Sequence, residues 1–272
     1  MKLALVQLEI EPAATSENLD RAVSAIERAA ADGAELVVLP ELFTVGYFAF
    51  DTYGRAAESL AGPTLTRLGD AAATEGVTLL AGSIVEDLAG TAAQTDVAVP
   101  AEEGLANTAV LFDADGERRL VYRKHHLFGY GSAEQELLTP GERLPVADIG
   151  PLTVGVTTCY DLRFPERYRE LVADGADLIL VPSAWPYPRV EHWRLLPRAR
   201  AVENLCYVAA ANGVGTFDDT ELLGRSTVYD PWGTTLASSG DEPGLVTATV
   251  DPERVRTVRS EFPALEDRRL SE

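Results

Sequence analysis

Short runs of apolar, β-branched residues alternate with amphipathic helical segments along the chain, and this alternation constrains the fold more than any other feature. No repeat, low-complexity tract or Gly/Ser linker interrupts it, so the pattern predicts one continuous domain over residues 1–272. Strands outnumber helices, and we therefore expect an α/β fold in which sheets stack between helical layers. Strands are predicted at 3–8, 35–40, 77–85, 107–113, 153–159, 177–182, 207–212, 225–230 and 244–250. Helices are predicted at 17–31, 63–75, 165–174 and 190–204.

The chain is strongly acidic, with a formal net charge of −20. Such a charge repels nucleic acid and anionic membranes, so neither is expected as a partner. No apolar run approaches the ~20 residues that cross a bilayer, and Met1 leads directly into the strand-like "LALVQLEI", so we expect a cytoplasmic protein. The acidity, with arginine in place of surface lysine, resembles that of proteins from salt-loving organisms. An acidic surface that serves solubility alone is the alternative.

The cysteines and histidines show no metal-site spacing. Cys159 and Cys206 are far apart, and no pair of histidines has the one-turn helical spacing of a zinc site, so we expect reduced thiols and no metal. Cys206, inside "NLCYVAA", fits a small buried apolar residue. A papain-like Cys-His protease would need His125, His126 or His192 as its base, but the local cysteine signature of those proteases is absent.

Three reactive side chains follow predicted strands, where side chains project into the crevice of an α/β sheet. They are Glu41 in "ELVVLPELF", Lys124 in "LVYRKHHLF" and Cys159 in "LTVGVTTCYDLRFPE". Each also has an ordinary explanation, because the cysteine could be a buried apolar residue, the glutamate a loop residue or helix cap, and the lysine a surface charge. A carboxylate, an ammonium and a thiol at three strand ends could nevertheless meet.

Lysine usage argues against the ordinary explanation for Lys124. Lysine occurs only at Lys2 and Lys124 among the 23 lysine and arginine residues, and the adjacent Arg123 already supplies a positive charge. A lysine brings a compact point charge to one oxygen atom, which a planar arginine does not. A thiol of pKa ~8.5 needs a base or a nearby cation to attack an amide carbonyl. Glu41 could take the proton of Cys159 while Lys124 stabilises the oxyanion.

The segments "PELF", "YRKHHLF" and "CYDLRFPE", in that order, resemble the three signature segments of the nitrilase superfamily of carbon-nitrogen hydrolases. The resemblance continues through 191–215 and 224–233, so it covers nearly the whole chain. It implies a four-layer αββα sandwich and hydrolysis of an amide with water, without a metal or organic cofactor. It also implies a homodimer or higher homo-oligomer, joined through helices and the C-terminal tail at 251–272.

The same resemblance implies a role for each reactive residue. Cys159 would be the nucleophile, Glu41 the general base and Lys124 the transition-state stabiliser. The backbone N–H of Tyr160 would help Lys124 to hold the oxyanion.

The family also carries a second glutamate between the lysine and a Pro-Gly pair. In this chain that pair is Pro140 and Gly141. Counting back from it, Glu134 fits better than Glu136.

The stretch "PSAWPYPRVEHW", which includes Trp185 and Arg189, resembles the ω-amidase branch. Members of that branch deamidate open-chain 2-oxo acid amides such as 2-oxoglutaramate. A dicarboxylate monoamide needs a cation at its far end, and Arg163 and Arg189 are candidates because a guanidinium grips a carboxylate with two hydrogen bonds. We therefore expect substrate contacts from Arg163, Trp185 and Arg189. The alternative for the two arginines is a structural salt bridge to Asp161, Glu166 or Glu191.

Other activities stay open at this point. An N-carbamoyl amide hydrolase or a nitrilase of the same superfamily is the enzymatic alternative, although "CYDLRF" differs from the "CWE" of true nitrilases. The non-enzymatic alternative is an inactive binding or scaffold protein on this fold.

Overall fold

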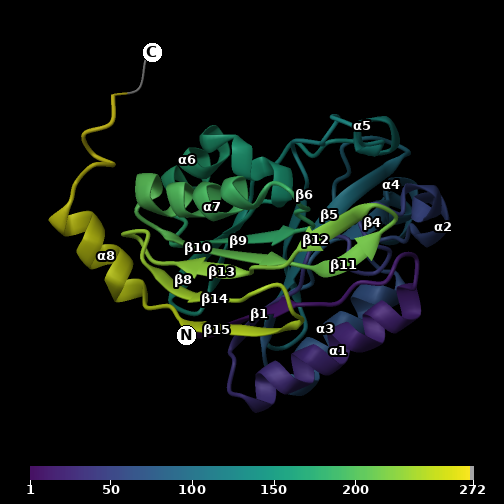
Figure 1. Cartoon of the computed structure of the whole chain (residues 1–272), viewed down its shortest axis with the longest axis horizontal. Coiled ribbons are helices and arrows are strands. Elements are labelled where there is room, and N and C mark those ends of the chain that lie inside the picture. Colours follow the sequence, from purple (N-terminus) through teal and green to yellow (C-terminus); the bar gives the residue numbers. More distant parts are fainter. Residues whose placement is uncertain (270–272) are drawn as a thin grey trace.

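The structure is a computed structural model that describes residues 1–269, and its two β-sheets lie face to face with helices on both outer surfaces (Figure 1). This is the α/β, four-layer αββα arrangement that the sequence predicts. The first sheet has the order β15-β1-β2-β3-β5-β4 with β6 paired to β5, the second has the order β14-β13-β10-β9-β8-β7, and β11 and β12 form a hairpin. The strands are β1 (Lys2–Gln7), β2 (Leu36–Val38), β3 (Thr78–Leu80), β4 (Ile84–Asp87), β5 (Leu105–Phe112), β6 (Arg118–Arg123), β7 (Val146–Ile149), β8 (Leu152–Val156), β9 (Leu178–Ser183), β10 (Tyr207–Asn212), β11 (Val214–Phe217), β12 (Thr220–Leu223), β13 (Thr227–Tyr229), β14 (Thr235–Ser238) and β15 (Gly244–Thr249).

Strands that are apolar on both faces explain the layering. Successive side chains of a strand point to opposite faces, so a strand buried on both sides reads as a continuous apolar run. In β1, Leu3 and Leu5 pack between the two sheets, whereas Ala4 and Val6 pack against the outer helices. The second sheet repeats the pattern, because alternate residues of β9 and β10 face the inner core and the helices.

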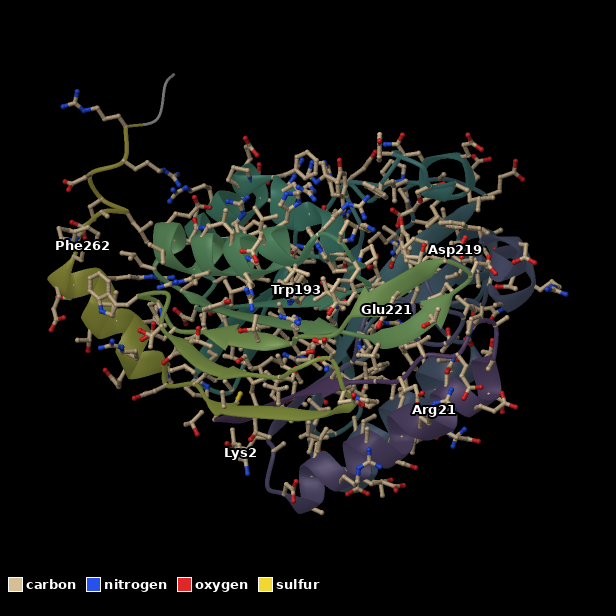
Figure 2. All side chains as sticks on the ribbon, viewed as in Figure 1. Lys2, Arg21, Trp193, Asp219, Glu221 and Phe262 are labelled. Carbon is tan, nitrogen blue, oxygen red and sulfur yellow. The ribbon has the colours of Figure 1, made fainter. Side chains whose placement is uncertain are left out.

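The outer layers are amphipathic helices. Helices α1 and α3 cover the first sheet, and α6 and α7 cover the second (Figure 1). Trp193, on α7, points toward the second sheet (Figure 2). No helix among residues 1–269 is long and apolar enough to cross a membrane. The helices are α1 (Thr15–Ala31), α2 (Tyr53–Ala56), α3 (Pro63–Glu75), α4 (Leu88–Gln94), α5 (Glu134–Leu137), α6 (Pro165–Ala173), α7 (Val190–Asn204) and α8 (Pro252–Glu261).

Two predicted strands differ from the structure. The strand predicted at 77–85 is two strands, β3 and β4, because Gly82 between them has a positive φ of 53° and lies against the carbonyl of Pro40. The strand predicted at 153–159 ends at Val156, so Cys159 begins a 3-10 turn, Cys159–Arg163, instead of ending a strand.

The C-terminal segment begins with a helix that the sequence pattern does not reveal. Val255 and Val258 of α8 are buried, and beyond α8 the chain extends away from the sandwich (Figure 1). Phe262 is half exposed there, and its ring lies 5.6 Å from that of Trp232. The end of the expected tail, residues 270–272, lies outside the described residues.

Candidate active site

Cys159 lies at a sharp turn between β8 and α6. Its backbone φ of 46° is in the left-handed region, which a residue with a side chain adopts only where the surrounding structure holds it. The carboxylate of Asp161 helps to stabilise this turn, because it accepts a hydrogen bond of 2.9 Å from Thr158 N. Burial raises the pKa of the Cys159 thiol well above its usual value, and the neighbouring Glu41 carboxylate raises it further, against the opposing effect of Lys124. The Cys159 side chain is therefore a protonated thiol at rest.

Glu41 is fully buried, three residues after β2. Its Oε1 accepts hydrogen bonds from Lys124 Nζ at 2.8 Å and from Asn107 Nδ2 at 2.8 Å, and its Oε2 accepts one from Ala184 N at 2.9 Å. Burial raises the pKa of Glu41 above its ordinary value, and Lys124 opposes that effect. A carboxyl group with a raised pKa is a better proton acceptor than an exposed one, which suits a general base.

Lys124 directly follows β6 and is also fully buried. Its ammonium group donates to Glu41 Oε1 at 2.8 Å and to Glu134 Oε1 and Oε2 at 2.8 and 3.0 Å. Although burial opposes the charge, Glu134 and Glu41 raise the pKa of Lys124 well above its usual value, so the side chain stays an ammonium. The ring of Tyr47 lies 5.1 Å from the nitrogen and adds a cation–π contact.

The second glutamate of this cluster is Glu134, at the start of α5, whereas Glu136 is exposed. Tyr47 Oη and Phe128 N donate to Glu134 Oε2 at 3.0 and 2.7 Å. These contacts join Glu134 to Tyr47 and to the loop that contains Phe128. They also fix the carboxylate that faces the ammonium.

Two members of this network carried no signal that the sequence reasoning used. Asn107, on β5, donates to both Glu41 and Glu134, and Tyr47 contacts both Glu134 and Lys124. An amide within the largely apolar stretch "NTAVLFD" is a signal for Asn107, because a buried polar group needs hydrogen-bond partners.

The carboxylate of Asp161 joins the lysine segment to the cysteine turn. It accepts hydrogen bonds from Tyr122 Oη at 2.6 Å, from His126 N at 3.0 Å and from Thr158 N at 2.9 Å, and it contacts His126 Nδ1 at 2.8 Å. Tyr122 and His126 stand two residues before and after Lys124. One buried carboxylate therefore bonds both to the segment around Lys124 and to the turn that carries Cys159.

The histidines do not provide a base for the thiol. His126 contacts Asp161, while His125 and His192 contact Arg167 and Arg163. None of the three is among the described residues that line the cavity at Cys159. Within residues 1–269, no group of three or more His, Cys, Asp or Glu side chains is placed to hold a metal ion.

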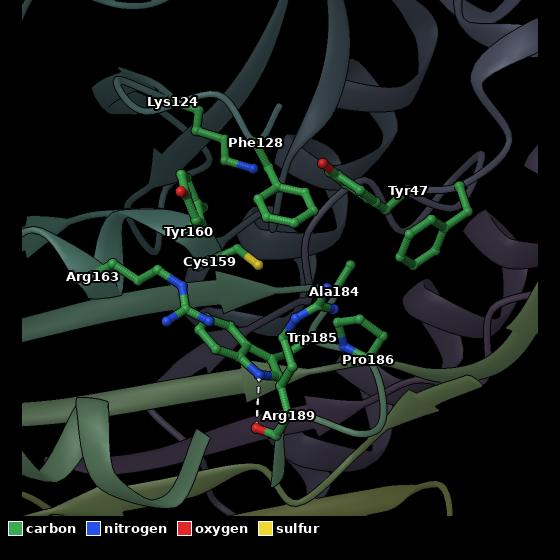
Figure 3. Close-up of a pocket in the computed structure, with 11 residues that line it drawn as sticks. Tyr47, Lys124, Phe128, Cys159, Tyr160, Arg163, Ala184, Trp185, Pro186 and Arg189 are labelled. Carbon is green, nitrogen blue, oxygen red and sulfur yellow. Dashed lines mark hydrogen bonds between the residues drawn. The ribbon is translucent and has the colours of Figure 1, made fainter. Parts of the chain in front are cut away.

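A small cavity, partly open to solvent, lies over the thiol (Figure 3). In this view Lys124 and Tyr47 lie on one side of the Cys159 sulfur and the two arginines, Arg163 and Arg189, on the other. Apart from Lys124 and Cys159, the cavity is lined by Tyr47, Phe48, Phe128, Tyr160, Arg163, Ala184, Trp185, Pro186 and Arg189. The walls between the charged ends are largely aromatic or apolar.

The structural salt bridges weighed for the two arginines are not formed among the described residues. Asp161 instead contacts His126, and Glu191 pairs with Arg194. The Arg163 guanidinium lies 5.1 Å from the ring of Trp185, and that of Arg189 lies 5.5 Å from the ring of Phe128. Both cations therefore line the cavity without a carboxylate partner from the described part of the chain.

Comparisons with known proteins match the chain along almost its whole length. The model of the carbon-nitrogen hydrolase family matches residues 2–260. The chain is 34% identical to a 2-oxoglutaramate amidase of Paenarthrobacter nicotinovorans, over 99% of this chain and 90% of the relative. It is also 34% identical to the human omega-amidase NIT2, over 98% of this chain and 95% of the relative.

Solved structures agree with these matches. Nit3 of Saccharomyces cerevisiae, described as a member of branch 10 of the nitrilase superfamily, superposes with a TM-score of 0.85 at 32% identity, over 97% of this chain and 94% of that one. An amidase from Nesterenkonia sp. AN1 superposes with a TM-score of 0.81 at 31% identity, over 97% of this chain and 95% of that one. That structure, of a mutant, has the acetamide moiety of fluoroacetamide added covalently at its active-site cysteine.

Proposed function

Because the chain belongs to the carbon-nitrogen hydrolase family, we propose that it is an amidohydrolase of the ω-amidase type, which releases ammonia from small linear amides through a cysteine thioester. The observation that carries the proposal is the convergence of three groups from distant parts of the chain. The thiol of Cys159 and the ammonium of Lys124 line one cavity, and the carboxylate of Glu41 is bonded to that ammonium.

In the first half of the reaction the Cys159 sulfur attacks the amide carbon while Glu41 accepts the thiol proton. The negative charge that develops on the carbonyl oxygen is held by Lys124 and by the backbone N–H of Tyr160. Loss of one such donor typically raises a barrier by roughly 3 to 4 kcal/mol. Glu41 then passes its proton to the leaving nitrogen, the C–N bond breaks and ammonia departs, which leaves a thioester on Cys159.

In the second half a water molecule attacks the thioester carbon. Glu41 accepts a proton from that water, and the second tetrahedral intermediate is held by the same donors. The C–S bond then breaks, the acid product leaves and the proton returns to the Cys159 sulfur. Glu134 keeps Lys124 in place throughout, because it accepts from the ammonium through both carboxylate oxygens.

The substrate we propose is a dicarboxylate monoamide such as 2-oxoglutaramate. The amide end would meet Cys159 and Lys124, and the far carboxylate would meet Arg163 or Arg189, which have no carboxylate partner among residues 1–269. The ring of Trp185 would form the apolar wall between the two ends. The names of the relatives with 34% identity support this choice.

Ammonia release measured across 2-oxoglutaramate, succinamate, glutamine, N-carbamoyl amino acids and a nitrile tests the assignment. Turnover of 2-oxoglutaramate or succinamate supports it, whereas turnover of the nitrile or carbamoyl compounds alone would make the substrate class wrong. No turnover of any of them would favour an inactive binding protein.

The role of Arg189 has a separate test. Arg189→Ala should raise KM selectively for amides with a distal carboxylate, and an equal effect on neutral amides rejects the contact. Arg194→Ala is the matched control, because Arg194 lies on the adjoining helix α7, is exposed and pairs with Glu191.

We also propose a cytoplasmic homodimer adapted to salt. The half-exposed Phe262 and the segment after α8, which extends from the sandwich, support a role of the C-terminal tail in the dimer interface. Both cysteines are buried free thiols, which suits a reducing compartment. Exposed acidic side chains such as Asp219 and Glu221 on the β11–β12 hairpin belong to the surface that salt would screen (Figure 2).

A further inference from the structure

Asn107 lies between the two carboxylates that hold the buried lysine. Its side chain is on β5 and is 1% exposed. Asn107 Nδ2 donates to Glu41 Oε1 at 2.8 Å and to Glu134 Oε1 at 3.2 Å. These are the same two oxygens that accept from Lys124 Nζ. The amide and the ammonium therefore bridge the two glutamates side by side.

The orientation of this amide is fixed by its surroundings. If the amide were flipped, Asn107 Oδ1 would face two carboxylate oxygens and both hydrogen bonds would be lost. In the observed orientation Oδ1 is buried and has no hydrogen-bond partner among the described residues. A buried acceptor without a partner costs stability. Oδ1 of Asn107 therefore lowers the stability of the fold, whereas Nδ2 donates hydrogen bonds to the two glutamates.

The charges of the site explain what the two N–H groups do there. Glu41 and Glu134 face a single ammonium in a buried place, so the cluster with both carboxylates ionised carries one uncompensated negative charge. Hydrogen bonds donated to a carboxylate favour its ionised form without adding a charge. A second cation at this position would make Glu41 a weaker base, and an apolar residue would leave it protonated over more of the pH range.

We propose that Asn107 is a positioning residue that keeps Glu41 ionised and aimed at the thiol, so that Glu41 is available as the base. This inference rests on the proposed amidohydrolase function, because it concerns the same base. It adds a residue that the Glu-Lys-Cys signature segments do not contain.

The test compares Asn107→Leu with Asn204→Leu. Leucine has nearly the shape of asparagine and removes the two donors together with the unpartnered acceptor. Asn204 is the matched control because it is also fully buried, donates through Nδ2 to a backbone carbonyl and has an unpartnered Oδ1, but lies at the end of α7 outside the site. The readouts are the pH profile of kcat/KM for succinamate and 2-oxoglutaramate, the separate kcat and KM values, and the melting temperature.

For Asn107→Leu we expect the acidic limb of the kcat/KM profile to move up by about one pH unit, since a hydrogen bond to a charged group is worth about that much. At neutral pH kcat should fall while KM changes little, and activity should recover as pH rises. The melting temperature should change little, because removal of the unpartnered acceptor offsets the loss of the two hydrogen bonds to the glutamates. Asn204→Leu should leave the pH profile unchanged.

An unmoved acidic limb in Asn107→Leu, or the same shift in Asn204→Leu, overturns the proposal. A loss of activity that is equal at every pH and parallels a lower melting temperature overturns it as well. If Asn107→Leu does not fold, Asn107→Asp keeps the shape and places a third carboxylate at the cluster. It should move the acidic limb further upward, and an unmoved limb there is equally decisive.

A second measurement separates this proposal from the proposed function. The rate of Cys159 alkylation by iodoacetamide, followed by peptide mapping, reports deprotonation of the thiol by Glu41 without any amide substrate. Its pH profile should shift in Asn107→Leu as the kcat/KM profile does. If the wild-type protein turns over no amide but this shift occurs, the amidase function is wrong and the role of Asn107 stands.

Discussion

Replacing Lys124 with methionine should remove activity and destabilise the protein, because the proposed mechanism uses the same buried ammonium that holds two carboxylates. Methionine keeps the length of the side chain and removes the charge. Lys124 Nζ makes hydrogen bonds to Glu41 and Glu134 at 2.8 Å, and the side chain is 1% exposed. The variant therefore leaves two buried carboxylates without their cation.

The expected magnitudes follow from these contacts. Removal of one partner from a buried ion pair costs about 3 to 5 kcal/mol, which for a chain of this size lowers the melting temperature by roughly 5 to 9 °C. Loss of an oxyanion donor should lower kcat by a factor of about 10² to 10³. Without Lys124 the folded-state pKa of Glu41, already raised by burial, rises further. A group whose pKa is raised on folding loses stability as pH rises, so the deficit of the variant should be smaller near pH 5 than near pH 8.

Thermal unfolding at both pH values and steady-state ammonia release measure these effects. Lys124→Arg is the paired variant, because it keeps a charge but replaces a compact ammonium with a bulky planar guanidinium. We expect it to fold and to be inactive. Wild-type activity in Lys124→Arg, or a Lys124→Met variant whose deficit does not depend on pH, would refute the reasoning.

The remaining predictions concern the neighbours of the lysine, the pH profile and the surface. Tyr47→Phe removes the 3.0 Å hydrogen bond to Glu134 and should lower kcat/KM by about tenfold in steady-state assays, and an unchanged value would contradict the contact. The acidic limb of the wild-type kcat/KM profile should titrate above 4.5, because burial raises the pKa of Glu41 above that value, and a limb below it would exclude Glu41 as the titrating base. Molar KCl should raise the melting midpoint by screening the net charge of −20, and no rise would reject adaptation to salt.

The layers of the fold could be predicted from the sequence because strands that are buried on both faces leave continuous apolar runs. The bounds of α3 and α7 agree with those predicted, since Pro63 marks the start of α3 and a left-handed residue follows each helix. Edge strands such as β7 and β14 were missed because they are short and partly exposed. The break at Gly82 depends on its contact with Pro40, which local patterns do not contain.

The candidate site was predictable only in part, for a similar reason. Glu41, Lys124 and Cys159 each follow a strand, and their residue types suggested their chemistry before any geometry was known. Asn107 and Tyr47 lie outside the three signature segments and resemble ordinary polar or aromatic residues within apolar segments. Their importance comes from which carboxylates they contact, and only the folded arrangement specifies that.

A quenched single-turnover experiment tests most directly whether the thiol at the base of this cavity becomes acylated. The protein is mixed with succinamate, acid-quenched within the first turnover and digested. The mass of the peptide that contains Cys159 is then measured by mass spectrometry. The proposed mechanism predicts a mass increase equal to the succinyl group on Cys159, one ammonia released for each acylated cysteine, and neither signal in Cys159→Ala. Ammonia release that persists in Cys159→Ala, or that proceeds in the wild-type protein with no acylated Cys159 peptide during the first turnover, would contradict it.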